Sequence, residues 1–103
     1  MPFYDLTKDE RTKAVELIDS TIRVELQRGN LINTIQYFSD PDTYIRKSAY
    51  LSIGRIYSSD KNLRPKITQI LTTLISHDDY KIRQTVINAA GEIGKNNFGE
   101  VRI

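Results

Sequence analysis

The residue types that most often carry acid–base or metal chemistry are scarce in this chain of 103 residues. The single histidine, His77, stands beside Asp78 and Asp79, and such a His–Asp pair could serve as an acid–base unit. No nucleophile motif accompanies it, and the absence of cysteine excludes a thiolate metal site, a cysteine nucleophile and a disulfide framework. We therefore predict no catalytic residue, no metal and no cofactor, and we expect His77 to lie in a solvated turn.

Two further patterns resemble ligand sites only superficially. Asp40 and Asp42 form a second acidic pair, which could bind Mg²⁺ in principle, but an aspartate directly before a helix more commonly caps it. Gly91 and Gly94 are spaced as in a G-x-x-G phosphate loop, yet they come at the end of a predicted helix, whereas a phosphate loop precedes one. We predict structural roles for both patterns.

Composition and charge leave the broad class open to binding functions. The chain has 39% hydrophobic and 27% charged residues, which is typical of one folded domain. Its 15 Lys and Arg residues are interleaved with 13 acidic residues, so the charge neither requires nor excludes nucleic acid. No apolar run approaches the roughly 18 residues of a membrane span, and no signal-peptide pattern is visible. We expect a cytoplasmic protein without a membrane segment.

Helices are the elements that must position these residues. Thr7 and Glu10 form a capping-box pattern, and Gly29 supplies a left-handed stop, so we predict a first helix over residues 7–28. Its apolar residues recur at helical spacing: Val15, Ile18, Ile22 and Leu26.

The remaining segments also show helical rather than strand periodicity. Asn30 can cap a second helix, which ends before Pro41, and a third covers about residues 42–57. A fourth begins at Pro65, a fifth covers about residues 79–94, and a sixth begins near Phe98. The predicted core residues of the second to fifth helices are Leu31, Ile32, Ile35 and Phe38; Ile45, Ala49, Ser52, Ile53 and Ile56; Ile67, Ile70, Leu71, Leu74 and Ile75; and Ile82, Val86, Ala90 and Ile93.

The chain repeats itself at a shift of 37 residues. The identical pairs are Ser39 and Ser76, Asp42 and Asp79, Ile45 and Ile82, Arg46 and Arg83, Gly54 and Gly91, and Ile56 and Ile93. Two helices in a unit of this length are typical of an α-solenoid repeat.

The segments 42–56 and 79–93 resemble the second helix of HEAT repeats, particularly the short bacterial HEAT-like repeats, which read roughly D-x-x-V-R-x-x-A-x-x-A-L-G-x-I. The departures are mild, with Ser52 and Val86 for Ala and Ala90 for Leu. The resemblance implies an all-α fold, an α–α superhelix of antiparallel helix pairs with about five helices and a truncated sixth. The expected divisions of this single domain are a capping helix at 6–29, repeat 1 at 30–58, repeat 2 at 63–95 and the start of a truncated third repeat at 96–103.

The repeated polar residues have predicted structural roles. Asp42 and Asp79 stand at helix starts, where a carboxylate caps free backbone amides. The resemblance implies that Arg46 and Arg83, one turn later, each bond to an aspartate of an adjacent repeat and so form a ladder between repeats.

Helical geometry also predicts a binding surface. With the apolar stripes turned inward, the opposite face of each second helix includes Gly54 and Gly91. The resemblance implies that the second helices line the concave surface of the stack. The candidate partner-binding strip on this face consists of Lys47, Tyr50, Leu51, Gln84, Ile87 and Asn88. Its apolar members favour a protein or peptide partner over phosphates.

The resemblance leaves several functions open. The favoured hypothesis is a non-catalytic HEAT-repeat scaffold that mediates protein–protein interaction, as a fragment of a longer array. The alternative is a DNA- or RNA-binding protein resembling the HEAT-like DNA alkylation repair proteins, with a basic concave face formed by Lys47, Arg55, Lys81, Arg83 and Lys95. A third is an accessory to an enzyme, as in the HEAT-like lyases that attach bilin pigments. Because no polar cap follows repeat 2, we also expect self-association through an open C-terminal face.

Overall fold

The computed structural model describes residues 5–96, and the regular elements of this part of the chain are all helical. They are α1 (Lys8–Arg28), α2 (Ile32–Phe38), α3 (Thr43–Ser59), the short 3₁₀ helix η2 (Lys61–Leu63), α4 (Arg64–Leu74) and α5 (Tyr80–Asn96). The predicted all-α fold is confirmed. The predicted sixth helix lies outside the described residues.

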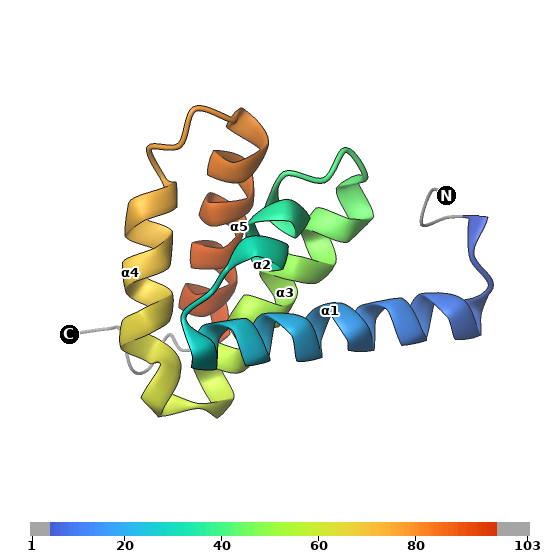
Figure 1. Ribbon diagram of the computed structural model, residues 1–103, viewed down its shortest axis with the longest axis horizontal. Helices are drawn as coiled ribbons and strands as arrows, with labels where there is room; N and C mark the ends of the chain where they lie inside the picture. Colours follow the sequence, from blue (N-terminus) through green and yellow to red (C-terminus); the bar gives the residue numbers. More distant parts are fainter. Residues whose placement is uncertain (1–4, 97–103) are drawn as a thin grey trace.

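The helices form two consecutive pairs with a long helix along one side. The pairs are α2 with α3 and α4 with α5, and α3 makes its most extensive contact with α5. Helix α1 packs against both α2 and α3, and its N-terminal half extends to the side of the other helices (Figure 1). The molecule measures 43 × 29 × 26 Å along its principal axes.

Helix α1 begins and ends where the sequence places its signals. The Thr7 hydroxyl accepts a hydrogen bond from the Glu10 amide at 3.1 Å, and the Glu10 carboxylate accepts one from the Thr7 amide at 2.8 Å. Gly29 then ends the helix with φ of 81°, a left-handed conformation that favours glycine. The strong local caps explain why a sequence pattern suffices to find this helix.

Helix α2 is capped from another helix rather than by its own residues. Glu25 of α1 accepts hydrogen bonds from the Thr34 amide and hydroxyl at 2.7 and 2.8 Å, and from the Asn33 amide and side chain at 3.0 Å each. Asn30, the predicted cap, accepts only one longer bond, from the Ile32 amide at 3.3 Å. The helix therefore begins at Ile32, one residue later than a cap at Asn30 predicts.

The cap on α2 yields a prediction about pH and stability. Burial alone raises the pKa of Glu25, but the hydrogen bonds from Thr34 and Asn33 outweigh it and hold the pKa below its ordinary value. The carboxylate therefore stabilises the fold above its unfolded-state pKa of about 4.3, and this contribution disappears as pH falls through the lower folded-state pKa. Glu25→Gln should lower the free energy of unfolding by about 1–3 kcal/mol at neutral pH. Urea unfolding across pH measures this, and the two proteins should converge in acid; an equal stability at neutral pH would contradict it.

One hydrophobic core lies between all five helices. Its largest fully buried apolar side chains are Ile22, Leu26, Phe38, Ile53, Ile56 and Ile67. Three predicted core residues are instead exposed, namely Ile32, Ile75 and Ala90. Ile32 is displaced because the Glu25 cap turns Thr34 inward, and the other two lie on a surface described below.

Candidate functional site

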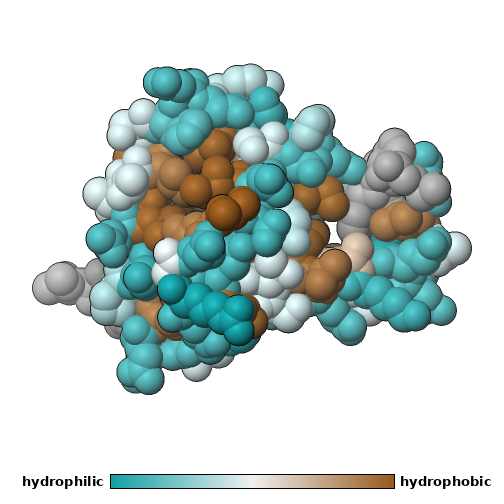
Figure 2. Space-filling model, viewed as in Figure 1, coloured by the Kyte–Doolittle hydropathy of each residue, from teal (hydrophilic) through white to brown (hydrophobic). Residues whose placement is uncertain are grey.

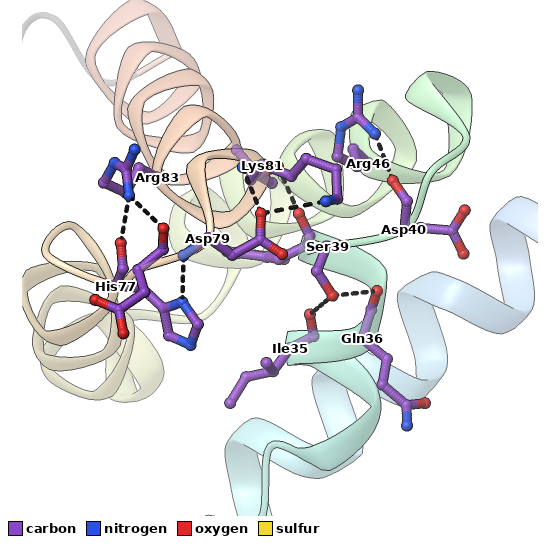
Figure 3. Close-up of polar contacts among 12 residues, drawn as sticks. Ile35, Gln36, Ser39, Asp40, Arg46, His77, Asp79, Lys81 and Arg83 are labelled. Carbon is purple, nitrogen blue, oxygen red and sulfur yellow. Dashed lines mark hydrogen bonds and ion pairs between the residues drawn. The ribbon is translucent and has the colours of Figure 1, made fainter.

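The turns before α3 and α5 are built on the same plan (Figure 3). Arg46 donates back to the backbone carbonyl of Asp40. Arg83 likewise donates to the carbonyls of His77 and Asp78, at 2.7 and 2.8 Å. The expected ladder between repeats is therefore wrong: each arginine holds the turn of its own repeat. The physical reason is that carbonyls just past a helix end lack helical partners, and a guanidinium one turn into the next helix reaches them.

The acidic residues and the histidine of these turns are also engaged in local bonds. Asp42 caps α3 by accepting from the Tyr44 amide at 2.9 Å, and Asp79 accepts from the Lys81 amide at 2.8 Å. That backbone bond is the main reason why the pKa of Asp79 lies below its ordinary value. The Nδ1 atom of His77 accepts from the Asp79 amide at 3.0 Å. Within residues 5–96 no three His, Asp or Glu side chains converge as a metal site would require.

The polar link between the repeats is made by Thr85. Its side chain is 2% exposed, and the hydroxyl lies 2.9 Å from the Phe38 carbonyl at the end of α2. The same hydroxyl lies 2.7 Å from the Lys81 carbonyl one turn earlier in α5. Its equivalent in repeat 1, Ser48, also bonds one turn back, to Tyr44. The match between Ser48 and Thr85 in the repeat thus reflects the bond that each makes one turn back in its own helix. The bond between Thr85 and Phe38 depends instead on the packing of α5 against α2.

A second polar link joins α1 to α3. The Ser52 hydroxyl, which is fully buried, donates to Asp19 at 2.9 Å. Arg55 donates to the same carboxylate oxygen at 3.2 Å, and Arg23 lies 3.6 Å from its other oxygen. This link accounts for the departure from the family pattern at position 52, because the equivalent Ala89 has no polar side chain and is packed in the core.

The six residues of the predicted binding strip have different environments. Lys47, Gln84 and Asn88 are exposed, while Tyr50 and Leu51 are half-buried, and Tyr50 packs against the core.

The expectation that Gly54 belongs to the same open face is wrong, because α5 crosses α3 at this point. A methyl group built on Gly54 would lie only 3.0 Å from Cβ of Glu92.

Ile87, the sixth residue of the predicted binding strip, lies in a groove between α4 and α5. This shallow groove, which we call the α4–α5 groove, has a volume of about 380 Å³ and is lined by Leu71, Thr72, Ile75, Val86, Ile87 and Ala90. Ile75 and Ile87 are 43% and 51% exposed, so the groove presents apolar side chains to water. The helical spacing predicts Ile75 in the core and Ile87 on the concave face, and it does not predict that the two side chains line the same groove.

The internal repeat explains why this groove is open. Moving back by 37 residues turns its six lining residues into Thr34, Ile35, Phe38, Ala49, Tyr50 and Ile53. All of these are buried or half-buried, and α5 packs against the two helices that carry them. Phe38 is 0% exposed, whereas its equivalent Ile75 is 43% exposed. The α4–α5 groove is thus the counterpart of a surface that repeat 2 covers on repeat 1.

A second apolar groove, of about 300 Å³, lies between α2 and α4, where Figure 2 shows hydrophobic side chains gathered. Its lining includes Leu31, Ile35, Ile70 and Leu74, with Lys66 among the polar lining residues. Ile70 and Leu74 are only 6% and 7% exposed, so a partner would remove little additional surface of these two from water. This groove is a crease over the core and a weaker docking surface than the α4–α5 groove.

The two equivalent glycines yield a prediction. A methyl group added to Gly91, within α5, would meet no side chain or other helix of residues 5–96 within 4 Å, while one added to Gly54 would meet Glu92 at 3.0 Å. Gly91→Ala should raise the free energy of unfolding by about 0.5–1 kcal/mol, because alanine favours the helix. Gly54→Ala should gain less or lose stability, because Glu92 must shift. Urea unfolding of both variants tests the difference, and equal gains would count against the close approach at Gly54.

Most of the basic residues considered for a nucleic-acid surface are engaged within the protein. Arg55 bonds to Asp19, Lys81 lies 3.3 Å from Asp79, and Arg83 donates to turn carbonyls. Of the five, Lys47 and Lys95 are exposed and make no ion pair with another described residue. Two separate lysines are a weak electrostatic footprint for a phosphate backbone.

Comparison with known proteins identifies one family. A family model described as HEAT repeats matches residues 33–99, which is more than half of the chain. Neither the curated proteins nor the solved structures gave a match. Among the helices of residues 5–96, none combines the length and apolar character needed to cross a membrane.

Proposed function

The chain belongs to the HEAT-repeat family, and from this premise we propose that it is a non-catalytic scaffold that binds a protein partner through the α4–α5 groove. HEAT repeats form helical scaffolds that are commonly used for protein interaction and are generally non-catalytic. The observation that carries the proposal is the joint exposure of Ile75 and Ile87 in one groove. Covering such side chains removes apolar surface from water, which is the main driving force of protein association. We place this activity in the cytoplasm.

The proposal assigns different tasks to different parts of the chain. Residues 6–29 cover repeat 1 (30–58), and repeat 2 (63–95) carries the docking groove. The turn residues, including Arg46 and Arg83, maintain the repeats and take no direct part in binding, since their polar atoms are bonded to their own turns.

A photo-crosslinker at a single position tests the proposal. A photoreactive amino acid replaces Ile87 in the full chain, and a matched variant carries it at Lys47, an exposed position on α3 that does not line the groove. In the cell that normally makes the protein, we expect covalent protein adducts from position 87 and few from position 47. The absence of adducts at 87, or equal adducts at both positions, would contradict the assignment.

The nucleic-acid alternative has its own measurement. Fluorescence anisotropy of a labelled DNA or RNA duplex at low salt should show no micromolar binding, because three of the five candidate basic residues are engaged within the protein. Micromolar binding that falls steeply with added salt would instead favour the nucleic-acid function.

A further inference from the structure

Four of the six exposed large apolar side chains within residues 5–96 fall into two pairs on separate surfaces, while Ile32 and Tyr80 belong to neither. Ile75 and Ile87 line the α4–α5 groove. Two more, Leu17 at 63% and Val24 at 41% exposure, lie on the outer side of α1, away from its buried stripe. The chain therefore presents one apolar surface at each end of the stack.

We infer that the occupant of the α4–α5 groove is the outer face of α1 from a second copy of this chain, so that copies associate head to tail. This inference rests on the proposed function, and it names the partner of that same groove. The centre of the outer face of α1 consists of Leu17, Ser20, Thr21 and Val24, which are spaced three and four residues apart on one side of the helix, and Lys13 and Arg28 lie at the two ends of this stripe.

The proposed contact continues a series of interfaces that already exists within one copy. Helix α1 packs with its inner stripe against α3, and α3 packs against α5. An α1 helix from a second copy, laid on α5, would be the next layer in this series. The dimensions allow it, because the 21 residues of α1 and the 17 of α5 correspond to helices of about 30 and 25 Å.

The surface of α5 leaves room for a helix to approach closely. Gly91 is the counterpart of Gly54, the point where α5 comes within 3.0 Å of a methyl position on α3. At the corresponding positions of Gly91 and Gly94, no side chain or other helix of residues 5–96 comes within 4 Å. Glycine within a helix costs stability, and no close contact within residues 5–96 requires either glycine. A closely packed second helix gives both residues a use.

The centre of the proposed contact carries no charged side chain. The four central residues of the outer α1 face and the six that line the α4–α5 groove are all uncharged. No isolated charge would therefore be buried at the centre of the interface, where the desolvation penalty is greatest. The near balance of 15 basic and 13 acidic residues also keeps the repulsion between copies small.

The two surfaces differ, so the association is heterologous and open-ended rather than a closed two-fold dimer. This gives a sharp test by sedimentation velocity of the full chain over a range of concentrations. Leu17→Lys removes the head surface and Ile87→Lys removes the tail surface, and each adds one positive charge. Both residues are exposed, so the variants should fold as the wild type does, which circular dichroism verifies.

The inference predicts a specific pattern. The wild type should form dimers and larger species as its concentration rises, and each variant alone should remain monomeric. An equal mixture of the two variants should form a one-to-one dimer and nothing larger, because only one intact head and one intact tail can meet.

Three results would overturn it: a wild type that stays monomeric at high concentration, a Leu17→Lys variant that still dimerises, or a mixture that does not associate. The photo-crosslink at position 87 separates this failure from that of the proposed function. Adducts with a different protein would leave the proposed function standing, and the absence of any adduct would remove both.

Discussion

Phe38→Ala is expected to lower the free energy of unfolding by about 3–5 kcal/mol, as large-to-small substitutions in well-packed cores do. The Phe38 ring is 0% exposed, and its backbone carbonyl accepts the buried Thr85 hydroxyl, so both repeats lose packing around the cavity. Such a loss is a large share of the stability of a domain of this size. Urea unfolding followed by circular dichroism measures it.

The chain supplies a matched control for this substitution. Ile75 is the residue equivalent to Phe38 in repeat 2, but it is 43% exposed in the α4–α5 groove. Ile75→Ala should therefore change stability by much less than Phe38→Ala. Comparable losses at both positions would mean that the groove is closed in solution and would contradict the contrast between the repeats.

Asp19→Ala is expected to lower the free energy of unfolding by about 1–3 kcal/mol, because it leaves the buried Ser52 hydroxyl without its acceptor on α1. Ser52→Ala alone should cost less, since the equivalent Ala89 is fully buried without a polar partner. The double variant Asp19→Ala with Ser52→Ala should be more stable than the sum of the two losses predicts.

A double-mutant cycle by urea unfolding measures this coupling. Asp9→Ala serves as the control, because Asp9 is an exposed acid on the same helix that forms no bond with α3. Strictly additive losses in the cycle would show that the contact between Asp19 and Ser52 contributes nothing to the docking of α1 on α3.

Local signals made the fold predictable from the sequence. The capping box at Thr7, the left-handed Gly29 and the 37-residue repeat are each determined by residues close together or by periodicity. The start of α2 is not predictable in this way, because its cap, Glu25, comes from another helix. Nothing in the spacing of Glu25 and Thr34 predicts this contact, because a glutamate that is exposed and caps no helix could stand at the same position.

The candidate site was predictable only in part, for a related reason. The helical periodicity of Ile75 and Ile87 is the same whether a helix is covered on one flank or on both. Only the structure shows that the flank covered by α5 in repeat 1 is open in repeat 2. The predicted arginine ladder between repeats is wrong because the family pattern identifies the residue at a position but not the hydrogen-bond acceptor that it contacts in this chain.

The proposed function depends on the docking of a protein in the α4–α5 groove. The yield of photo-crosslinked adducts at position 87, measured in a variant in which Ile75 is replaced, tests this docking. Ile75→Lys alters the centre of the groove at an exposed position, where a basic residue at the end of α4 suits the helix dipole. We predict that the photo-crosslinked adducts at 87 disappear in this background while unfolding by urea is nearly unchanged. Adducts that persist at the wild-type yield would show that the groove is not the docking surface.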